Sequence, residues 1–209
     1  GECTTYGWWI ANPVIVAFPD GDSLGGDDWP RDVAVTMTID DPSNGSGVDF
    51  TDTQMPGDGP WAPNGTWINF DLNGFDLKSG DLVTYDNGQT TKTHTVMNLT
   101  ITSIDLENDK LSGTADPNAE IQVWVETPFS SMNRHTTVDV NGVWFVDYSV
   151  PGNNSDEQDI VDITLGTQGQ VKAYDDEWDS TQIDWRVPNP SFNVWLNQNK
   201  VDGYDWPQY

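Results

Sequence analysis

The chain has 209 residues, with 34 acidic against 8 basic side chains and a formal charge of −26. Binding to a phosphate backbone depends on Lys and Arg, so this charge excludes nucleic-acid binding. No stretch reaches the roughly 18 consecutive apolar residues of a membrane span, so we expect none. The single cysteine, Cys3, has no intrachain partner and is either incidental or paired with another chain.

The composition favours strands over helices, since Val, Ile and Thr are abundant and Ala and Leu are scarce. Alternation of apolar and polar residues, interrupted by turn residues such as Asn87-Gly88, predicts short strands along the whole chain. In chain order we expect strands near residues 14–18, 33–39, 66–72, 82–86, 92–97, 99–104, 110–115, 120–126, 135–140, 143–149, 160–164, 170–174 and 181–187. Strands at this spacing predict an all-β protein of antiparallel β-sandwiches.

A long internal repeat relates the two ends of the chain at an offset of 177 residues. The first 32 residues align with the last 32 without a gap, and eight positions are identical. The identical residues are Thr4, Trp8, Asn12, Pro13, Gly26, Asp28, Trp29 and Pro30, matched by Thr181, Trp185, Asn189, Pro190, Gly203, Asp205, Trp206 and Pro207.

A weaker half-repeat divides the 177-residue unit into two related domains. Gly26-Asp-Asp-Trp-Pro30 resembles Gly113-Thr-Ala-Asp-Pro117, and Asn64-Gly-Thr-Trp-Ile68 resembles Asn141-Gly-Val-Trp-Phe145. We therefore expect one sandwich over residues 12–97 and a second over residues 98–188. Residues 1–11 match the closing strand of the second domain, and residues 189–209 match the opening strand of the first. Each end is expected to be completed by something outside one copy, because an isolated strand leaves its backbone polar groups unpaired.

The segment Leu111-Ser-Gly-Thr-Ala-Asp-Pro-Asn-Ala-Glu-Ile-Gln-Val-Trp-Val125, followed by Thr136-Thr-Val-Asp-Val-Asn-Gly-Val-Trp-Phe145, resembles bacterial immunoglobulin-like repeats. The resemblance covers residues 97–188 well and residues 12–96 loosely, and Asn118 stands where the family usually has Gly. It implies tandem immunoglobulin-like sandwiches in extracellular stalks, adhesins or surface layers, without catalysis.

The residues themselves single out no enzyme site. Acidic side chains are plentiful but no pair stands out, and no nucleophile with a base is visible, so we expect no enzyme. His94 and His135 fall in predicted strands without a second ligand at a metal spacing. We expect both to be exposed strand residues.

Among chemical roles, calcium binding is favoured over catalysis, because Asp-rich loops supply the oxygen ligands that hard cations prefer. A solvated acidic rim that keeps the chain soluble is favoured over calcium as the explanation of these clusters. The candidate ligands are Asp20, Asp22, Asp27 and Asp28 in one loop and Asp175, Asp176 and Asp179, beside Glu177, in another.

Eleven Trp residues allow sugar binding on exposed aromatic surfaces as an alternative to core or interdomain packing. Trp29 and Trp206, each before a proline at the same corner of successive repeats, suit a repeated junction, whereas Trp61 and Trp178 lie in loops and are expected to be exposed. Four sequons, at Asn44, Asn64, Asn98 and Asn153, suggest glycosylation of a surface protein.

The sequence thus predicts a structural component of an extracellular or cell-surface filament, stalk or surface layer. Its partners would be copies of itself in a head-to-tail polymer or tandem array. Continuity could come from a longer polypeptide with many units or from subunits that exchange terminal strands. The alternative function is a carbohydrate-binding or adhesin module that takes glycans on exposed Trp and Asp-rich loops.

Overall fold

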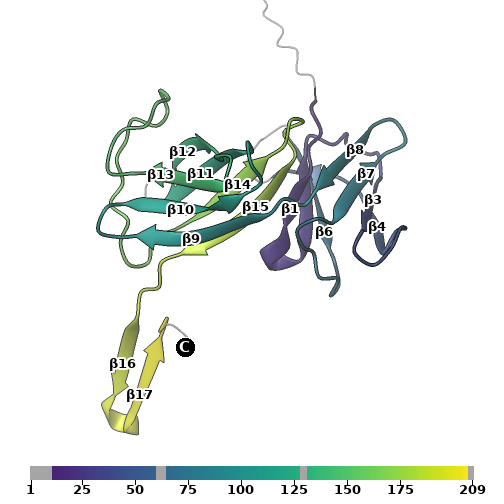
Figure 1. The fold of residues 1–209 in the computed structure, drawn as a ribbon. Coiled ribbons are helices and arrows are strands. Elements are labelled where there is room, and N and C mark those ends of the chain that lie inside the picture. The colour runs from purple at the N-terminus through teal and green to yellow at the C-terminus, as the bar shows by residue number, and fades with distance from the viewer. Residues whose placement is uncertain (1–10, 60–64, 128–130, 207–209) are drawn as a thin grey trace, which may run out of the picture. The chain divides into compact units, whose positions relative to one another are not determined.

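The computed structural model describes residues 11–59, 65–127 and 131–206 and confirms an all-β fold built mainly of antiparallel strands (Figure 1). The chain forms two compact units. Unit 1 contains the residues up to Val96 together with Asp175–Thr181, and unit 2 contains Met97–Tyr174 and Gln182–Tyr209. In the part of the chain that is described, no helix is long and apolar enough to cross a membrane.

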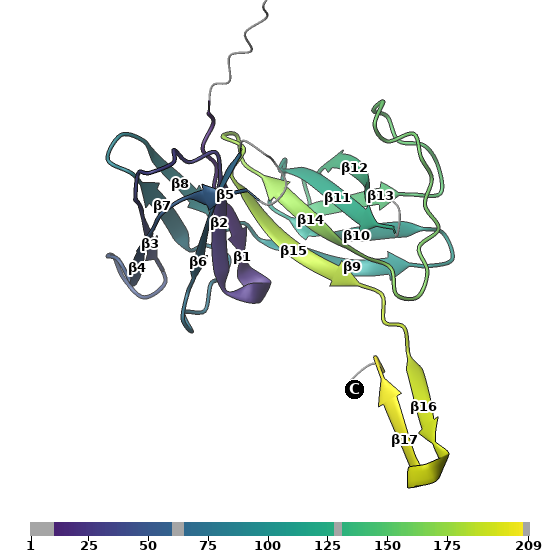
Figure 2. The same cartoon turned by 180° about the vertical axis from the view of Figure 1, so that it is seen from behind.

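Unit 1 is a sandwich of two four-stranded sheets. One sheet has the order β1-β2-β6-β5 and the other β4-β3-β7-β8. Figure 2 shows β1, β2 and β6 side by side, and the first residues of β15 pair with β1 in parallel, Ser180 with Val16 and Thr181 with Ala17. The strands are β1 (Val16–Phe18), β2 (Ser23–Asp27), β3 (Val35–Asp40), β4 (Phe50–Gln54), β5 (Gly57–Asp58), β6 (Thr66–Asp71), β7 (Leu82–Asp86) and β8 (Thr91–Thr95), with a 3-10 turn, η1 (Pro19–Gly21), between β1 and β2.

Unit 2 repeats this topology with seven strands, the number in a constant-type immunoglobulin sandwich. Its sheets have the orders β13-β10-β9 and β12-β11-β14-β15. In the first sheet, β10 pairs with β9 and β13, as β2 pairs with β1 and β6 in unit 1. In the second sheet, β11 pairs with β12 and β14, as β3 pairs with β4 and β7. The strands are β9 (Leu99–Asp105), β10 (Lys110–Ala115), β11 (Glu120–Glu126), β12 (Ser131–Thr137), β13 (Val143–Asp147), β14 (Gln168–Tyr174) and β15 (Ser180–Arg186), and a separate hairpin follows as β16 (Ser191–Trp195), η2 (Leu196–Gln198) and β17 (Lys200–Tyr204).

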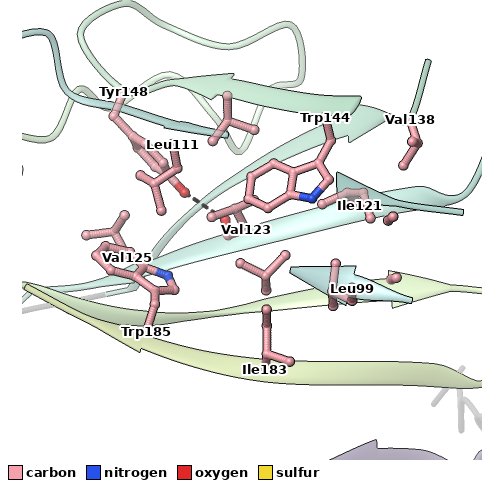
Figure 3. Packing of buried hydrophobic residues seen from close by; sticks show 14 of the residues in the cluster. Leu99, Leu111, Ile121, Val123, Val125, Val138, Trp144, Tyr148, Ile183 and Trp185 are labelled. Carbon is pink, nitrogen blue, oxygen red and sulfur yellow. Dashed lines mark hydrogen bonds between the residues drawn. The ribbon is translucent and has the colours of Figure 1, made fainter. Parts of the chain in front are cut away.

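Each unit has its own apolar core, to which both of its sheets contribute. In unit 2 the predicted alternation on β11 is confirmed, because Ile121, Val123 and Val125 are buried and Trp124 lies on the outer face. Trp144 of β13 packs beside Ile121 and Val123 (Figure 3). A buried tyrosine hydroxyl ties the two sheets of each unit together.

The half-repeat aligns Trp67 with Trp144, but the strand pairing places the two rings on opposite faces. Gly26 and Gly113 are matched by the half-repeat, and they pair with Ile68 and Trp144 respectively. Trp144 therefore corresponds to Ile68 and points into the core. Trp67 is displaced by one residue, and a shift of one residue moves a side chain to the other face of a sheet.

Some predicted strand positions are wrong. The sequence prediction missed three strands of unit 1, β2, β4 and β5, which lack a clear apolar alternation. Strand β12 begins at Ser131, whereas the prediction placed its start at residue 135. Residues 160–164 alternate between exposed and buried as expected, but they form no strand. The amide of Ile163 donates to Asp109 Oδ1 at 2.8 Å and that of Val161 to the carbonyl of Tyr148 at 3.0 Å, so this segment is held without a strand ladder.

The loop between β13 and β14 is organised by two buried charged side chains from unit 2. Arg134 is 3% exposed and donates to the carbonyl oxygens of Asp147, Val150 and Asp159. Glu157 is 2% exposed and accepts hydrogen bonds from the backbone and side chain of both His135 and Asn154. His135 itself is exposed, as predicted.

Candidate assembly site

The hairpin at residues 191–206 has the same local structure as the hairpin at residues 14–29, and we call them the second and first hairpins. In the first, Val16 pairs with Gly25; in the second, Asn193 pairs with Asp202, each position being displaced by 177 residues. Both hairpins turn through a three-residue 3-10 helix at the same place. The sequence repeat is therefore a repeat of three-dimensional structure.

The same side chains fix the backbone of both hairpins. The turn ends on a left-handed residue, Asp22 (φ 44°) in the first and Asn199 (φ 46°) in the second, and Asp and Asn tolerate this conformation better than other residues with a side chain. The indole Nε1 of Trp29 donates to the carbonyl of Val14 at 3.1 Å. Its counterpart Trp206 donates to Ser191 at 3.0 Å, so a Trp closes each hairpin across its open end.

The two hairpins differ in burial. The core-facing side chains of the first hairpin are fully buried: Ile15, Ala17, Leu24 and Trp29 are each 0% exposed. The matching side chains of the second hairpin are exposed: Phe192 64%, Val194 54%, Val201 65% and Trp206 60%. Strand β6 and the opposite sheet cover the first hairpin, whereas among the described residues β16 and β17 pair only with each other. An exposed apolar face of this kind is a candidate interaction surface.

A buried carboxylate fixes the edge of the first hairpin. Asp179 is 0% exposed, and its Oδ1 accepts the amide hydrogen of Ile15 at 2.7 Å. Its Oδ2 forms an ion pair with Lys92 Nζ at 3.1 Å, and the same Nζ lies 3.0 Å from Glu177 Oε2. Burial raises the pKa of Asp179 despite the hydrogen bond from Ile15 and the charge of Lys92. The hairpin is thus held by residues that lie 164 positions later in the chain.

His94 belongs to the same cluster, and the expectation that it is exposed is wrong. Its side chain is buried, with Nδ1 2.8 Å from Asp175 Oδ2 and Nε2 3.0 Å from Thr181 Oγ1. Burial raises the pKa of Asp175, but hydrogen bonds, first that from His94, outweigh burial and hold the pKa below its usual value. Both partners of His94 come from residues 175–181, and no local pattern around residue 94 points to them.

An ion pair fixes the base of the second hairpin. The guanidinium of Arg186 donates to both carboxylate oxygens of Asp205, at 3.1 and 2.7 Å, and the amide of Asn189 donates to Asp205 Oδ2 at 2.6 Å. A bidentate contact of this kind fixes direction as well as distance. The second hairpin is therefore held at its base, while its apolar face stays exposed.

The predicted calcium ligands lie in two separate places within unit 1. Asp22, Asp27 and Asp28 are half-buried and Asp20 is exposed, and Asp22 Oδ1 accepts the amide hydrogen of Leu77 at 3.0 Å. In the other loop Asp175 and Asp179 take the contacts described above, and Asp176 is exposed. Among the described residues, no three His, Cys, Asp or Glu side chains form a group that could hold a metal. The calcium site stays a prediction.

The other predicted site residues have mixed positions. Trp178 is 66% exposed at a left-handed turn position with φ 67°. The sequon residues Asn44, Asn98 and Asn153 are exposed, whereas Trp61, Asn64 and Cys3 lie outside the described residues. Sequence reasoning missed Phe192 and Val194, although the 177-residue offset aligns them with Ile15 and Ala17.

Comparison with known proteins adds little to this geometry. No protein-family model matches the chain, and no curated protein does. The chain is similar to the crystal structure of a tetra-tandem repeat in the extending region of a large adhesion protein, with 16% identity over 83% of this chain and 48% of that one and a TM-score of 0.30. It is also similar to a structure of the receptor tyrosine kinase Torso, titled as the basis of its neurohormone perception, with 8% identity over 80% of this chain and 69% of that one and a TM-score of 0.24. The chain spans about half the length of the adhesion-protein repeat structure, and at these scores neither likeness bears on function.

Proposed function

We propose that the protein is a non-catalytic structural segment of an extracellular fibre, stalk or surface layer, in which β-sandwiches of one topology follow one another. The second hairpin is the opening hairpin of a further sandwich. One observation carries this proposal: the second hairpin reproduces the first in register, turn and tryptophan contact, yet exposes the side chains that the first one buries.

The energetic argument concerns the exposed apolar side chains. Burying a Val, Leu or Phe side chain contributes roughly 1.5–3 kcal/mol. Phe192, Val194, Val201 and Trp206 therefore represent several kcal/mol of stabilisation that becomes available only when a sheet covers them. The charge of −26 keeps the chain soluble while these apolar side chains are uncovered.

Whether the apolar face of the second hairpin is an assembly surface can be tested on the 209-residue chain. We expect concentration-dependent association, measured by sedimentation velocity, and binding of a dye specific for apolar surfaces. The double variant Val194→Asp, Val201→Lys should lose both properties. Val140→Asp is the matched control, because Val140 is 82% exposed but lies outside both hairpins. Equal association of the double variant and the control would show that the hairpin face is not an assembly surface.

Two routes could supply the further sandwich, and the mass of the native assembly after strong denaturation separates them. A band far above 23.2 kDa means that one long polypeptide carries successive units. A band at 23.2 kDa means that separate subunits exchange hairpins, which requires unit 1 of a second copy to accept the second hairpin. Native material that shows neither filaments nor arrays in electron micrographs would contradict the structural role itself.

Sugar binding remains the second candidate function, and exposed Trp178 favours it. An exposed indole face can stack on a sugar ring, and the acidic side chains beside it can accept hydrogen bonds from hydroxyl groups. A glycan array should then give a signal that Trp178→Ala abolishes. Unchanged binding by this variant, or none at millimolar sugar, would eliminate the candidate.

A further inference from the structure

The outer face of the first hairpin contains a close contact between Gly25 and the ring of Trp67. A Cβ built on Gly25 would lie 2.3 Å from the ring of Trp67, so any side chain there would overlap the indole. The Trp67 ring also meets Phe18 edge to face, with centroids 6.5 Å apart. The indole on β6 thus covers β2 at Gly25, one of the two positions where β2 has no side chain.

The second hairpin has different side chains at these positions. Asp202 stands in the place of Gly25, and Trp195 stands in the place of Phe18. The Nε1 of Trp195 donates to Asp202 Oδ2 at 3.0 Å. The second hairpin therefore carries its own indole on this face, paired with a carboxylate, and has a side chain at the position where Trp67 covers a glycine in the first hairpin.

Two of the core-facing positions become larger and one becomes smaller. Phe192 replaces Ile15 and Val194 replaces Ala17, whereas Val201 replaces Leu24, and all three of these residues of the first hairpin are 0% exposed in a packed core. Adding atoms to a packed core forces side chains off their preferred rotamers and destabilises the fold. Gly203 and Trp206 keep the residue types of Gly26 and Trp29, so the hairpin remains of the same kind while its fit is altered.

We propose that the second hairpin docks on an incomplete sandwich that has the strand order of residues 31–96 but a small side chain in the position of Trp67, and that unit 1 of a second copy of this chain is excluded as the acceptor. The inference rests on the proposed function and deepens it. The acceptor offers an apolar sheet with space for the Trp195–Asp202 pair and for Phe192. The order in which domains follow one another is then set by these side chains, because a hairpin accepted by one sandwich is rejected by the other.

The test exchanges the hairpins within the full chain. Residues 12–30 are replaced by the sequence of residues 189–207, which has the same length, first with Trp67 retained and then with Trp67→Ala. Hydrogen exchange of the β3 and β6 amides during heating reports the stability of unit 1. With Trp67 retained, we expect the unfolding midpoint of unit 1 to fall by roughly 10 °C or more, and with Trp67→Ala we expect the part of that loss that comes from the outer-face contact to be recovered.

Single substitutions separate the role of this contact from general misfolding. Gly25→Asp should lower the midpoint of unit 1, and Trp67→Ala in the same chain should restore it. Asp202→Gly is the matched control, because it alters the equivalent position of the second hairpin and should leave unit 1 unchanged.

Each outcome of the exchange has a distinct meaning. Rescue by Trp67→Ala supports the proposal. Full stability with Trp67 retained overturns it, because the hairpins would be interchangeable between copies, while the proposed function would stand. Failure of both exchanged chains would overturn the assignment of the exclusion to Trp67, since the misfit would then lie at the core-facing positions, while the proposed function would stand.

Discussion

Asp179 in unit 1 and Glu157 in unit 2 are both buried carboxylates, and their pKa values shift in opposite directions. Burial raises the pKa of Asp179 in unit 1, since a single backbone amide and the Lys92 ion pair do not compensate for it. Burial also acts on Glu157 in unit 2, but hydrogen bonds from His135 and Asn154 outweigh it and hold the pKa below its usual value. The lowered pKa of Glu157 thus accompanies more hydrogen-bond donors than Asp179 has.

Substitution of Trp144 and Trp67, which the half-repeat aligns, should give the largest difference in stability between the two units. Trp144→Ala should destabilise unit 2 by about 3–5 kcal/mol, because it empties the centre of a packed core. Trp67→Ala should cost unit 1 about 1 kcal/mol, because the ring packs on the outer face of the sheet. Urea unfolding followed by hydrogen exchange measures both. Equal losses would mean that the two rings occupy equivalent positions after all.

Removal of the buried carboxylate of unit 1 should have the next largest effect. Asp179→Ala leaves the Ile15 amide without an acceptor and Lys92 with Glu177 as its remaining ion-pair partner. We expect a loss of about 3 kcal/mol, confined to unit 1. Asp176→Ala, at an exposed neighbour, is the control and should change stability by less than about 0.5 kcal/mol. A loss of the same size in both variants would rule out a specific role for Asp179.

Acid should destabilise unit 2 more than unit 1, because the shifted carboxylates of unit 2 all have lowered pKa values. The side chain of Asn108 lowers the pKa of Asp105 and the amide of Val143 lowers that of Asp139, and for Asp147 hydrogen bonds, first that from Ser149, outweigh burial, as they do for Glu157. A lowered pKa contributes stability that is present above the unfolded-state value, near 4, and is lost as the pH falls through the folded-state value.

Unit 1 combines both signs. The Lys78 ammonium lowers the pKa of Asp41 to about 2, and Asp175 is lowered as well. Burial raises the pKa of Asp81 and Asp179, so these two favour the folded state as the pH falls through their folded-state values. Between pH 6 and pH 3 we therefore expect exchange protection to decrease more in unit 2 than in unit 1. A steeper decrease in unit 1 would contradict the assigned directions.

The smallest effects concern the buried tyrosines, in which the units should behave alike. Tyr85 donates to the carbonyl of Gly25 at 3.1 Å, and Tyr148 donates to that of Val123 at 2.7 Å (Figure 3). Each Tyr→Phe variant removes one neutral hydrogen bond, so we expect a loss of about 1 kcal/mol in the unit concerned. Calorimetry of the two variants measures it, and a difference of more than about 1 kcal/mol between them would show that the two contacts are not equivalent.

The sequence predicted most of the strands and failed where structure depends on distant partners. Alternation located β11 and its buried face, since Ile121, Val123 and Val125 follow a period of two. Alternation did not predict that the ring of Trp67 lies on the outer face, because the strand pairing of the matching motif is shifted by one residue. It also could not find the burial of His94, whose partners lie about 80 residues later.

The candidate site was predicted in part. The 177-residue repeat alone identifies the second hairpin and relates it to the first. It does not show that the shared tryptophan closes each hairpin, nor that Asp202 occupies a place reserved for glycine. Both facts depend on which atoms meet across strands.

The contact between Asp179 and Ile15 also constrains the order of folding. The hydrogen bond from the Ile15 amide cannot form until residue 179 has been synthesised, although strands β1 to β8 end at Thr95. Closing a loop of 164 residues is entropically costly, so this contact forms late. In a growing chain, unit 1 therefore stays without this contact until the strands of unit 2 have been synthesised. A chain that stops before residue 175 leaves unit 1 without the carboxylate of Asp179.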